Sequence, residues 1–409
     1  MPEDTTALRR RLEHYLHTAD AARAWLAPAE QRLPLNGAPV PAFPDYDAAV
    51  DWAEREQPTL GVLVRAAASA GLDRMAWQLA ETTWHAWPST AADADWLEVG
   101  RAGLAAAERE GDTTGQIRLL ISLGTAYRAA NRLDDGLRTL ARALELCRAT
   151  DNAPDEAHAL NLIGLLHLRA RRLDSAAACF ESALSTFREL GEEHWAAVVL
   201  SNLASTRFSA GPAADARDAV RQALAAHRAL GNRRGEGNVL RIVAALHNEC
   251  GEPDEAYAAA REALTIATAL RDRTLEAYWL LPLGDVQRAT AAYGDALISY
   301  QRSAPLHRRL GDRSREALAW RGAGLTYAAL DRPAEAAAFH RRAATVHAEL
   351  GDAWEHALDL THLATALVPT DPASARTHVT QARACLTPFT DPRADAVRAE
   401  IDCRLSQLP

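Results

Sequence analysis

Lysine is absent from this chain, and all 45 of its basic residues are arginine. The phosphate-binding loops of P-loop ATPases and protein kinases depend on a lysine, as do Schiff-base and pyridoxal-phosphate enzymes. The sequence therefore excludes these chemistries for these 409 residues acting alone.

Cysteine and long apolar runs are also scarce. The five cysteines are Cys147, Cys179, Cys250, Cys385 and Cys403. They are far apart and form no C-x-x-C pair, so we expect reduced, mostly buried thiols and no disulfide framework or zinc site. No run of about 18 apolar residues and no leader-like start is present, which predicts a cytoplasmic protein without a transmembrane helix.

The charge balance is acidic, with a net charge of -9. This argues against general binding to nucleic acids or membranes. Aromatic residues make up only 6%, whereas Ala, Leu, Arg and Glu dominate, which favours helices. Nothing in the pattern of His, Cys, Asp and Glu predicts a metal or another cofactor.

The sequence repeats every 40 residues from 111 to 350, and each block reads as two amphipathic helices. One position in the first helix is always small: Gly124, Gly164, Ala204, Ala244, Gly284 and Gly324. One position in the second helix is mostly bulky: Leu140, Phe180, Val220, Ala260, Tyr300 and His340. Helices approach closely only where side chains at the crossing are small, so we expect the same crossing in every block.

The block boundaries carry helix-ending and helix-starting signals. Glycines that tolerate a left-handed cap follow a leucine at Gly191, Gly231, Gly311 and Gly351. Residues suited to the next N-cap then follow at Asn232, Asp312 and Asp352. Prolines stand just before or within the first turn of the second helices at Pro212, Pro253, Pro333 and Pro372, where a missing N–H costs little.

These residues resemble the tetratricopeptide repeat. The resemblance rests on Leu123-Gly124-x-x-Tyr127 with Gly136, Leu140 and Ala143, and on the matching positions of later blocks. It implies an all-α fold, a right-handed α-solenoid of helix-turn-helix repeats. The predicted domains are a helical bundle with a Pro-rich loop at 1–70, a divergent first repeat at 71–110, six repeats at 111–350, and a degenerate last repeat with a cap helix at 351–409.

The first hundred residues predict helices at 5–27, 45–56 and 59–70 around a proline-rich loop at 28–46. The first helix carries the stripe Leu8, Leu12, Leu16 and then Ala21 or Trp25. Six tryptophans crowd this region: Trp25, Trp52, Trp77, Trp84, Trp87 and Trp96. We favour a large core over the alternative, an aromatic docking pocket.

The segment from Trp52 to Leu60 resembles the start of the helical sensor region in actinobacterial regulators of the STAND class, which include antibiotic regulatory proteins. Gln57 stands where those regulators usually have Arg. The resemblance implies a sensor half without its nucleotide-binding module, either a fragment of a longer regulator or a free-standing relative. The absence of Lys agrees with that expectation.

The first helices of such a stack line a concave groove, and their exposed positions are the candidate ligand site. These are Arg118, Arg128, His158, Asn161, Arg169, Asn238, Arg241, Asn248, Tyr278, Asp285, Arg288 and Arg321. Asn can bond the backbone of an extended peptide, and Arg presents a planar fork to carboxylates or phosphates. We therefore expect a protein or peptide partner, with an anionic ligand as a further expectation.

Three functions remain open at this point. The first is a sensor or regulatory domain of a transcriptional or signalling regulator. The second is a free-standing adaptor that scaffolds a multiprotein complex. The third is an enzyme that uses the groove, which we do not expect because no H-E-x-x-H, G-x-S-x-G or dinucleotide-binding turn is present.

Overall fold

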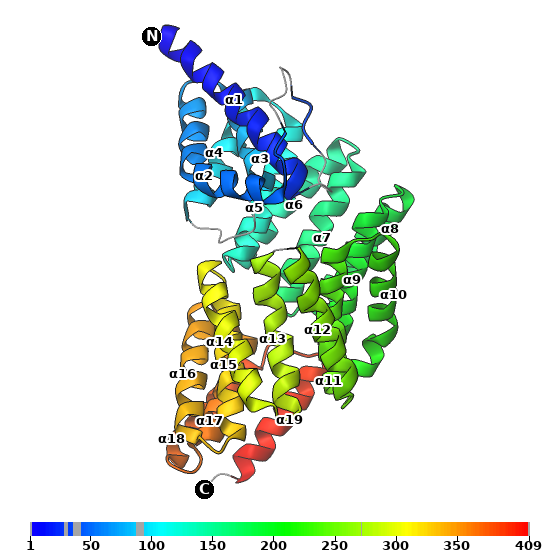
Figure 1. Cartoon of the computed structure of the whole chain (residues 1–409), viewed down its shortest axis with the longest axis vertical. Helices are drawn as coiled ribbons and strands as arrows, with labels where there is room; N and C mark the ends of the chain where they lie inside the picture. The colour runs from blue at the N-terminus through cyan, green and yellow to red at the C-terminus, as the bar shows by residue number, and fades with distance from the viewer. Residues whose placement is uncertain (1, 28–31, 36–41, 87–93, 271, 408–409) are drawn as a thin grey trace. The chain divides into compact units, whose positions relative to one another are not determined.

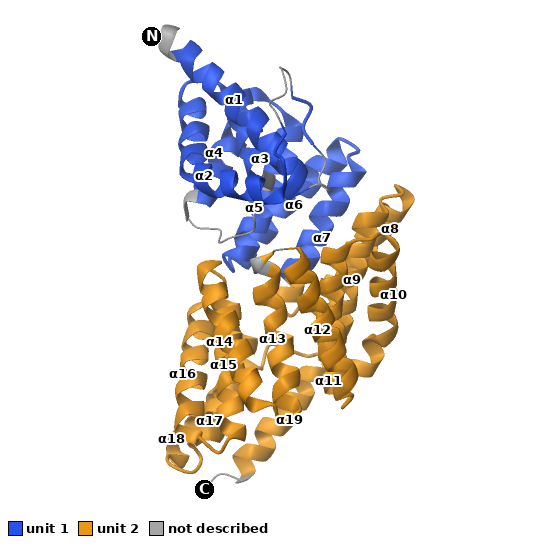
Figure 2. Ribbon diagram, in the orientation of Figure 1, with its two compact units in different colours: residues 1–166 blue, residues 167–409 orange. Residues whose placement is uncertain are grey.

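The predicted fold class is confirmed, because the residues that the structure describes form helices and no strands. This computed structural model describes residues 2–27, 32–35, 42–86, 94–270 and 272–407. The chain divides into two compact units, Met1–Leu166 and His167–Pro409, coloured separately in Figure 2. The helices follow one another along each unit as antiparallel pairs (Figure 1).

The helices are short and nearly uniform. Unit 1 holds α1 (Pro2–Leu26), α2 (Tyr46–Ser69), α3 (Asp73–Ala86), α4 (Ala94–Glu110), α5 (Thr113–Ala129) and α6 (Leu133–Ala149). Helix α7 (Ala153–Arg169) crosses the boundary. Unit 2 continues with α8 (Leu173–Glu189), α9 (Glu193–Ala210), the 3-10 helix η1 (Ala213–Ala216), α10 (Arg217–Ala229), α11 (Arg233–Glu249), α12 (Pro253–Ala269), α13 (Arg273–Ala289), α14 (Tyr293–Arg309), α15 (Arg313–Ala329), α16 (Pro333–Glu349), α17 (Ala353–Leu367), α18 (Pro372–Cys385) and α19 (Pro392–Gln407).

From α3 to α17, left-handed residues spaced by multiples of 20 positions separate most of the helices. The predicted glycine caps are confirmed, with positive φ at Gly191, Gly231, Gly311 and Gly351. The turns inside the pairs use other residues at the same interval: Asn131, Arg171, Gly251, Ala291 and Asp331. The predicted N-caps are also confirmed, because Asn232, Asp312 and Asp352 accept bonds from backbone N–H groups three residues later.

One turn departs from this pattern. Gly211 has an extended backbone with φ -142, and η1 follows it instead of the first turn of an α-helix. Pro212 explains the difference, because a proline disfavours helical or left-handed geometry in the residue before it. Pro253, Pro333 and Pro372 begin α-helices as predicted.

The helix crossings confirm the repeat register. A Cβ atom placed on Gly124 would lie 2.6 Å from side-chain atoms of Leu140. The same test on Gly284 gives 2.7 Å to the Tyr300 ring, and on Gly324 it gives 2.7 Å to His340. At these three crossings the small position of the first helix therefore faces the bulky position of its own second helix.

Unit 1 departs from the sequence prediction in two places. Residues 46–69 form one helix, α2, where we predicted two helices interrupted near Pro58. The apolar face on both sides of Pro58, with Trp52 and Ala53 before it and Leu60 after it, is buried and holds the helix together. In α1, Ala22 rather than Ala21 or Trp25 continues the buried stripe of Leu12 and Leu16.

The tryptophans of unit 1 mainly fill its core, as we favoured. Trp52 and Trp77 are buried, and Trp84 stacks on Trp96 with ring centroids 5.0 Å apart. Trp25 is the exception, because 41% of it is exposed and its indole N–H donates to the Phe43 carbonyl. Trp87 and most of the proline-rich loop lie outside the described residues.

The last helix packs on the preceding pair through an apolar stripe. Ile401 of α19 is fully buried against α17 and α18, and Val397 and Leu405 are partly buried beside it. This stripe is the four-residue spacing seen in the sequence. The opposite side of α19 is polar.

Overpacking one crossing tests the register energetically. We expect Gly284→Leu to lower the free energy of unfolding by about 1–3 kcal/mol, because the new side chain would collide with the buried Tyr300 ring. Gly294→Ala is the matched control, since its Cβ would meet open space and the helix propensity of alanine favours it by roughly 1 kcal/mol. Urea denaturation of both variants makes the comparison, and a Gly284→Leu protein as stable as wild type would contradict this crossing.

Candidate functional site

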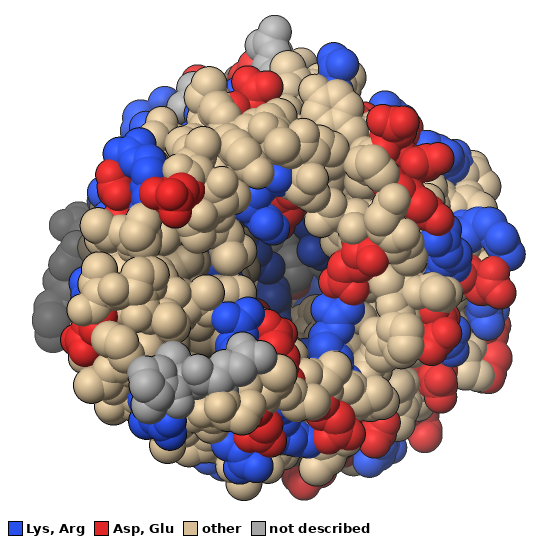
Figure 3. Space-filling view, turned by 90° about the horizontal axis from the view of Figure 1, so that it is seen from below, with Lys and Arg blue, Asp and Glu red and all other residues tan. Residues whose placement is uncertain are grey.

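The first helices of successive pairs in unit 2 lie side by side. Helix α9 contacts α11, α11 contacts α13, α13 contacts α15, and α15 contacts α17. We call the charged and polar side chains that these helices contribute here the inner surface. Its exposed or half-buried members are Arg241, Tyr278, Asp285, Arg315, Arg321 and Glu355, and the buried Asp359 supports Arg321. The space-filling view in Figure 3 shows a central hollow whose wall carries basic and acidic side chains.

Arg241 of α11 is the most unusual member of the inner surface. Its side chain reaches water, yet surrounding protein displaces enough solvent, helped by the charge of Arg315, to lower the pKa of Arg241 to about 10. Among the residues that the structure describes, no hydrogen bond or ion pair reaches its guanidinium. Arg241 therefore brings an uncompensated positive charge to the inner surface.

Arg315 and Tyr278 lie beside Arg241 and are already engaged. The Arg315 guanidinium stacks 4.3 Å from the centre of the Tyr278 ring and donates to Asp312 at 2.6 Å. Burial acts to raise the pKa of Asp312, but Arg315 holds it at about 2. The Tyr278 hydroxyl also donates to Asp312, at 3.3 Å. One carboxylate thus offsets Arg315, and none offsets Arg241.

The repeat explains why Arg241 lacks a partner. Arg321 occupies the equivalent position two blocks later, and it bonds Asp359 at 2.5 Å and Glu355 at 2.7 Å. The residues that stand 80 positions before that acidic pair are Leu275 and Trp279. Arg241 and Arg321 thus share a block position, although Leu281 stands there in the block between them, and apolar residues stand where Arg241 would need the acidic partners of Arg321.

Asp285 and Tyr300 form the buried floor of a second cluster. The Tyr300 hydroxyl donates to Asp285 at 2.6 Å. Burial raises the pKa of Asp285, whereas Tyr300, Arg288 and Arg321 act in the opposite direction. Burial and the Asp285 charge also raise the pKa of Tyr300 well above its ordinary value. Asp285 and Arg288 are therefore tied to structural contacts, which leaves them less available than Arg241.

The remaining candidate residues of unit 2 are half-buried or paired. Arg169 lies 3.6 Å from Asp352. Asn238 is exposed and its side-chain oxygen accepts the indole N–H of Trp279 at 3.3 Å. Asn248 is half-buried near the end of α11.

The four candidate residues of unit 1 lie in a different environment. Arg118 forms an ion pair with the buried Glu81 at 3.3 Å, and Arg23 of α1 forms a second ion pair with the same carboxylate. Asn161 is 5% exposed, and burial lowers the pKa of His158 to about 4. Arg128 is half-buried. Burial and internal pairing of these side chains make them weaker ligand candidates than Arg241.

Sequence reasoning missed Arg315, Glu355 and Asp359 as members of the inner surface. Arg315 lies nine residues before the small position Gly324, whereas no candidate residue lies more than six residues before the small position of its own block. Glu355 and Asp359 belong to the block after 350, where the repeat weakens. A comparison of equivalent block positions for charge would have identified the acidic pair.

A serine, a histidine and an aspartate also meet inside unit 2. His347 bonds Asp359 at 2.6 Å and lies 3.4 Å from the Ser314 hydroxyl. All three are buried, so the hydroxyl offers no access to a substrate. The block equivalent His307 likewise bonds a first helix, at the Ala277 carbonyl. The arrangement is therefore a recurrent packing contact.

The cysteines are free, but fewer are buried than the sequence suggested. Cys147 is buried, Cys179, Cys250 and Cys385 are half-buried, and Cys403 is exposed. Within the described residues, no helix has the length and apolar character needed to cross a bilayer. The described residues also contain no cluster of three or more His, Cys, Asp or Glu side chains able to hold a metal.

Comparison with known proteins confirms the repeats. The tetratricopeptide repeat family profile matches residues 115–189 and 155–229. The regulatory protein AfsR of Streptomyces griseus is 29% identical over 200 residues, which cover 48% of this chain and 20% of that protein. The chain thus spans about a fifth of the length of this curated relative.

Two solved structures are similar to this chain at low sequence identity. The Rap protein, solved in complex with competence and sporulation factor, has a TM-score of 0.51 at 10% identity, covering 82% of this chain and 98% of that one. A STAND protein with a tetratricopeptide repeat sensor from Pyrococcus horikoshii has a TM-score of 0.48 at 13% identity, covering 77% and 53% respectively. The first of these similarities supports the α-solenoid fold.

Buried histidines near the inner surface make stability depend on pH. Burial lowers the pKa of His340 to about 4, and burial together with the neighbouring His340 lowers that of His362 to about 3. The folded state thus holds both neutral, while the unfolded chain binds protons below about pH 6.5, so stability falls as pH drops. At pH 5 we expect His340 to account for roughly 2 kcal/mol of the loss.

His340→Leu isolates this contribution. Leu140 occupies the equivalent position against Gly124, and the His340 Nδ1 atom makes no hydrogen bond in the described structure, so the substitution fits the site. Between pH 7.5 and pH 5, thermal unfolding should show a smaller fall in stability for the variant than for wild type. If the stability of the variant and of wild type fell equally with pH, His340 would not resist protonation in the folded state.

Proposed function

We propose that this chain is a recognition module that binds a protein or peptide partner on the inner surface of unit 2. The tetratricopeptide repeats support this role, since stacked helix pairs present extended concave surfaces to partners. The fold resembles that of the Rap protein, whose structure was solved with a bound factor. The proposal assigns the contact to the first helices of the pairs.

Arg241 is the observation that carries the proposal. The Arg241 guanidinium reaches water, is partly desolvated and has no internal partner among the described residues. It is therefore suited to bind a carboxylate or phosphate by donating two parallel hydrogen bonds. Arg315 lies in the same cluster but is offset by Asp312, which leaves Arg241 as the charge that a partner would meet. The partner we propose therefore carries an acidic side chain, a phosphate or a free carboxyl terminus.

We further propose that recognition serves regulation. The partial similarity to the regulatory protein AfsR supports this, and so does the lack of Lys, which suits a sensor part that relies on another module for nucleotide chemistry. A free-standing adaptor is the alternative. The gene distinguishes them, because a reading frame that encodes a nucleotide-binding module next to this region favours the regulator. Our proposal for either case is a binding protein without catalysis.

Charge reversal at Arg241 tests the binding site. We expect Arg241→Glu to weaken binding of an acidic peptide, selected by screening the full chain against a peptide array, by about 10- to 100-fold, because a charge-assisted bond contributes roughly 1.5–3 kcal/mol. Titration calorimetry at fixed salt measures the affinity. Thermal unfolding verifies that the variant folds.

Arg309→Glu is the matched control. It reverses the charge of an exposed arginine at the end of the second helix α14 and should leave the affinity unchanged. Equal affinities for wild type and both variants would place the binding site elsewhere. A screen in which neutral peptides bind as tightly as acidic ones would reject the proposed ligand chemistry.

A further inference from the structure

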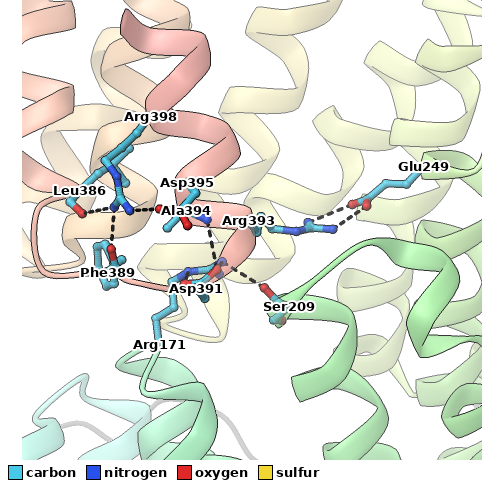
Figure 4. A network of polar contacts seen from close by, with 10 residues as sticks. All are labelled: Arg171, Ser209, Glu249, Leu386, Phe389, Asp391, Arg393, Ala394, Asp395 and Arg398. Atoms are coloured by element: carbon cyan, nitrogen blue, oxygen red, sulfur yellow. Dashed lines mark hydrogen bonds and ion pairs between the residues drawn. The ribbon is translucent and has the colours of Figure 1, made fainter.

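The start of α19 returns to the beginning of unit 2. Asp391, just before α19, forms a two-bonded ion pair with Arg171, which lies in the turn between α7 and α8. The distances are 2.7 Å from Arg171 Nη2 to Asp391 Oδ1 and 3.1 Å from Nε to Oδ2. The Nη2 atom also donates to the Ser209 carbonyl at 3.0 Å. Figure 4 shows these bonds.

A second ion pair reinforces the first. Arg393 in the first turn of α19 bonds Glu249 of α11 through both nitrogens, at 3.0 Å and 2.5 Å. Its guanidinium also lies 5.0 Å from the centre of the Phe208 ring in α9. We call the Arg171–Asp391 and Arg393–Glu249 pairs together the clasp (Figure 4).

Arg171 has a backbone that an arginine adopts at a cost. Its φ is 55, and most turns of this kind in the chain use Gly, Asn or Asp. The side chain accounts for the exception, because it is nearly buried, with 9% exposed, and its guanidinium lies 3.5 Å from the centre of the Trp354 ring. The turn thus holds a strained residue whose long side chain reaches α17 and α19.

Asp391 has two functions that can be separated. Its Oδ1 atom accepts the Ala394 N–H at 3.1 Å, which caps α19, and the same carboxylate pairs with Arg171. The segment before it is held by Arg398, which donates to the carbonyls of Leu386 and Phe389 at 3.0 Å and 2.6 Å. The later part of α19 is anchored by the buried Ile401. The clasp therefore joins an anchored helix to the opposite end of unit 2.

We propose that α19 is a strap whose clasp holds the first and last helices of unit 2 together and regulates access to the inner surface. This regulation rests on the function proposed above. Arg169, two residues before the clasp arginine, lies 3.6 Å from Asp352 at the start of α17, so the same two ends meet again next to the inner surface. Opening the clasp separates these ends and widens the entrance for a partner.

Two variants of the full chain test the strap without a ligand. Arg171→Gly removes the guanidinium but keeps the left-handed turn, and Asp391→Asn removes the charge but keeps a good N-cap. In both we expect the radius of gyration from solution X-ray scattering to rise. Hydrogen exchange of amides 396–400 in α19 should also accelerate, by about tenfold or more.

Each variant has a control with the same local chemistry outside the clasp. Ala291→Gly relieves a left-handed turn with φ 59, and Asp371→Asn alters the cap of α18, where Asp371 accepts the Ser374 N–H. Neither control should change the radius of gyration or the exchange of α19.

A wild-type radius of gyration in both clasp variants would overturn the proposal, whatever the exchange rates. Because these measurements need no ligand, they stand apart from the Arg241→Glu titration. A strap that opens in a protein whose Arg241 variant binds normally would uphold the device and reject the ligand site. If the Arg241 variant binds weakly but the clasp variants keep the wild-type radius, the ligand site is upheld and only the strap is rejected.

Discussion

The helix pairs that have glycine at the crossing depend on the contact between that glycine and one bulky residue. Gly124 against Leu140, Gly284 against Tyr300 and Gly324 against His340 leave no room for a Cβ atom at the crossing. This contact sets how closely the two helices of a pair approach, and the left-handed turns at 20-residue intervals set where each helix ends. The rest of the stack follows from repeating the unit.

The repeated packing leaves positions on the first helices where polar residues can vary. The crossing involves only some positions of each helix. Other positions recur on the inner surface and have no packing role. Arg241 and Arg321 show the outcome, because they hold the same block position but differ in their neighbours. Arg321 is neutralised by Glu355 and Asp359, whereas Leu275 and Trp279 stand in their place next to Arg241. Arginines at equivalent positions of a repeat protein can thus differ in whether acidic side chains neutralise them.

The sequence predicted what is periodic. The six blocks, the glycine caps and the crossings follow from residues that recur at fixed intervals, and Gly284 against Tyr300 was readable from its equivalents. Non-periodic features were missed or misjudged. Pro58 suggested a break in a helix that buried contacts keep whole, and spacing alone could not tell that Arg118 is paired with a buried glutamate while Arg241 is not. Partners from distant helices decide such cases.

The clasp is the clearest case of a feature outside any local pattern. Arg171 and Asp391 are 220 residues apart, and each has a local explanation, as a turn residue and as a helix cap. The kind of contact also matters. Interfaces between neighbouring helix pairs are apolar and continuous, so opening one exposes core. The closing contact is made by two ion pairs, Arg171–Asp391, which is largely buried, and Arg393–Glu249, which is partly exposed. When such groups part, their renewed hydration offsets much of the lost attraction. Within unit 2 the clasp is therefore the contact suited to open and close without unfolding, because the desolvation and the attraction of its charged groups nearly balance.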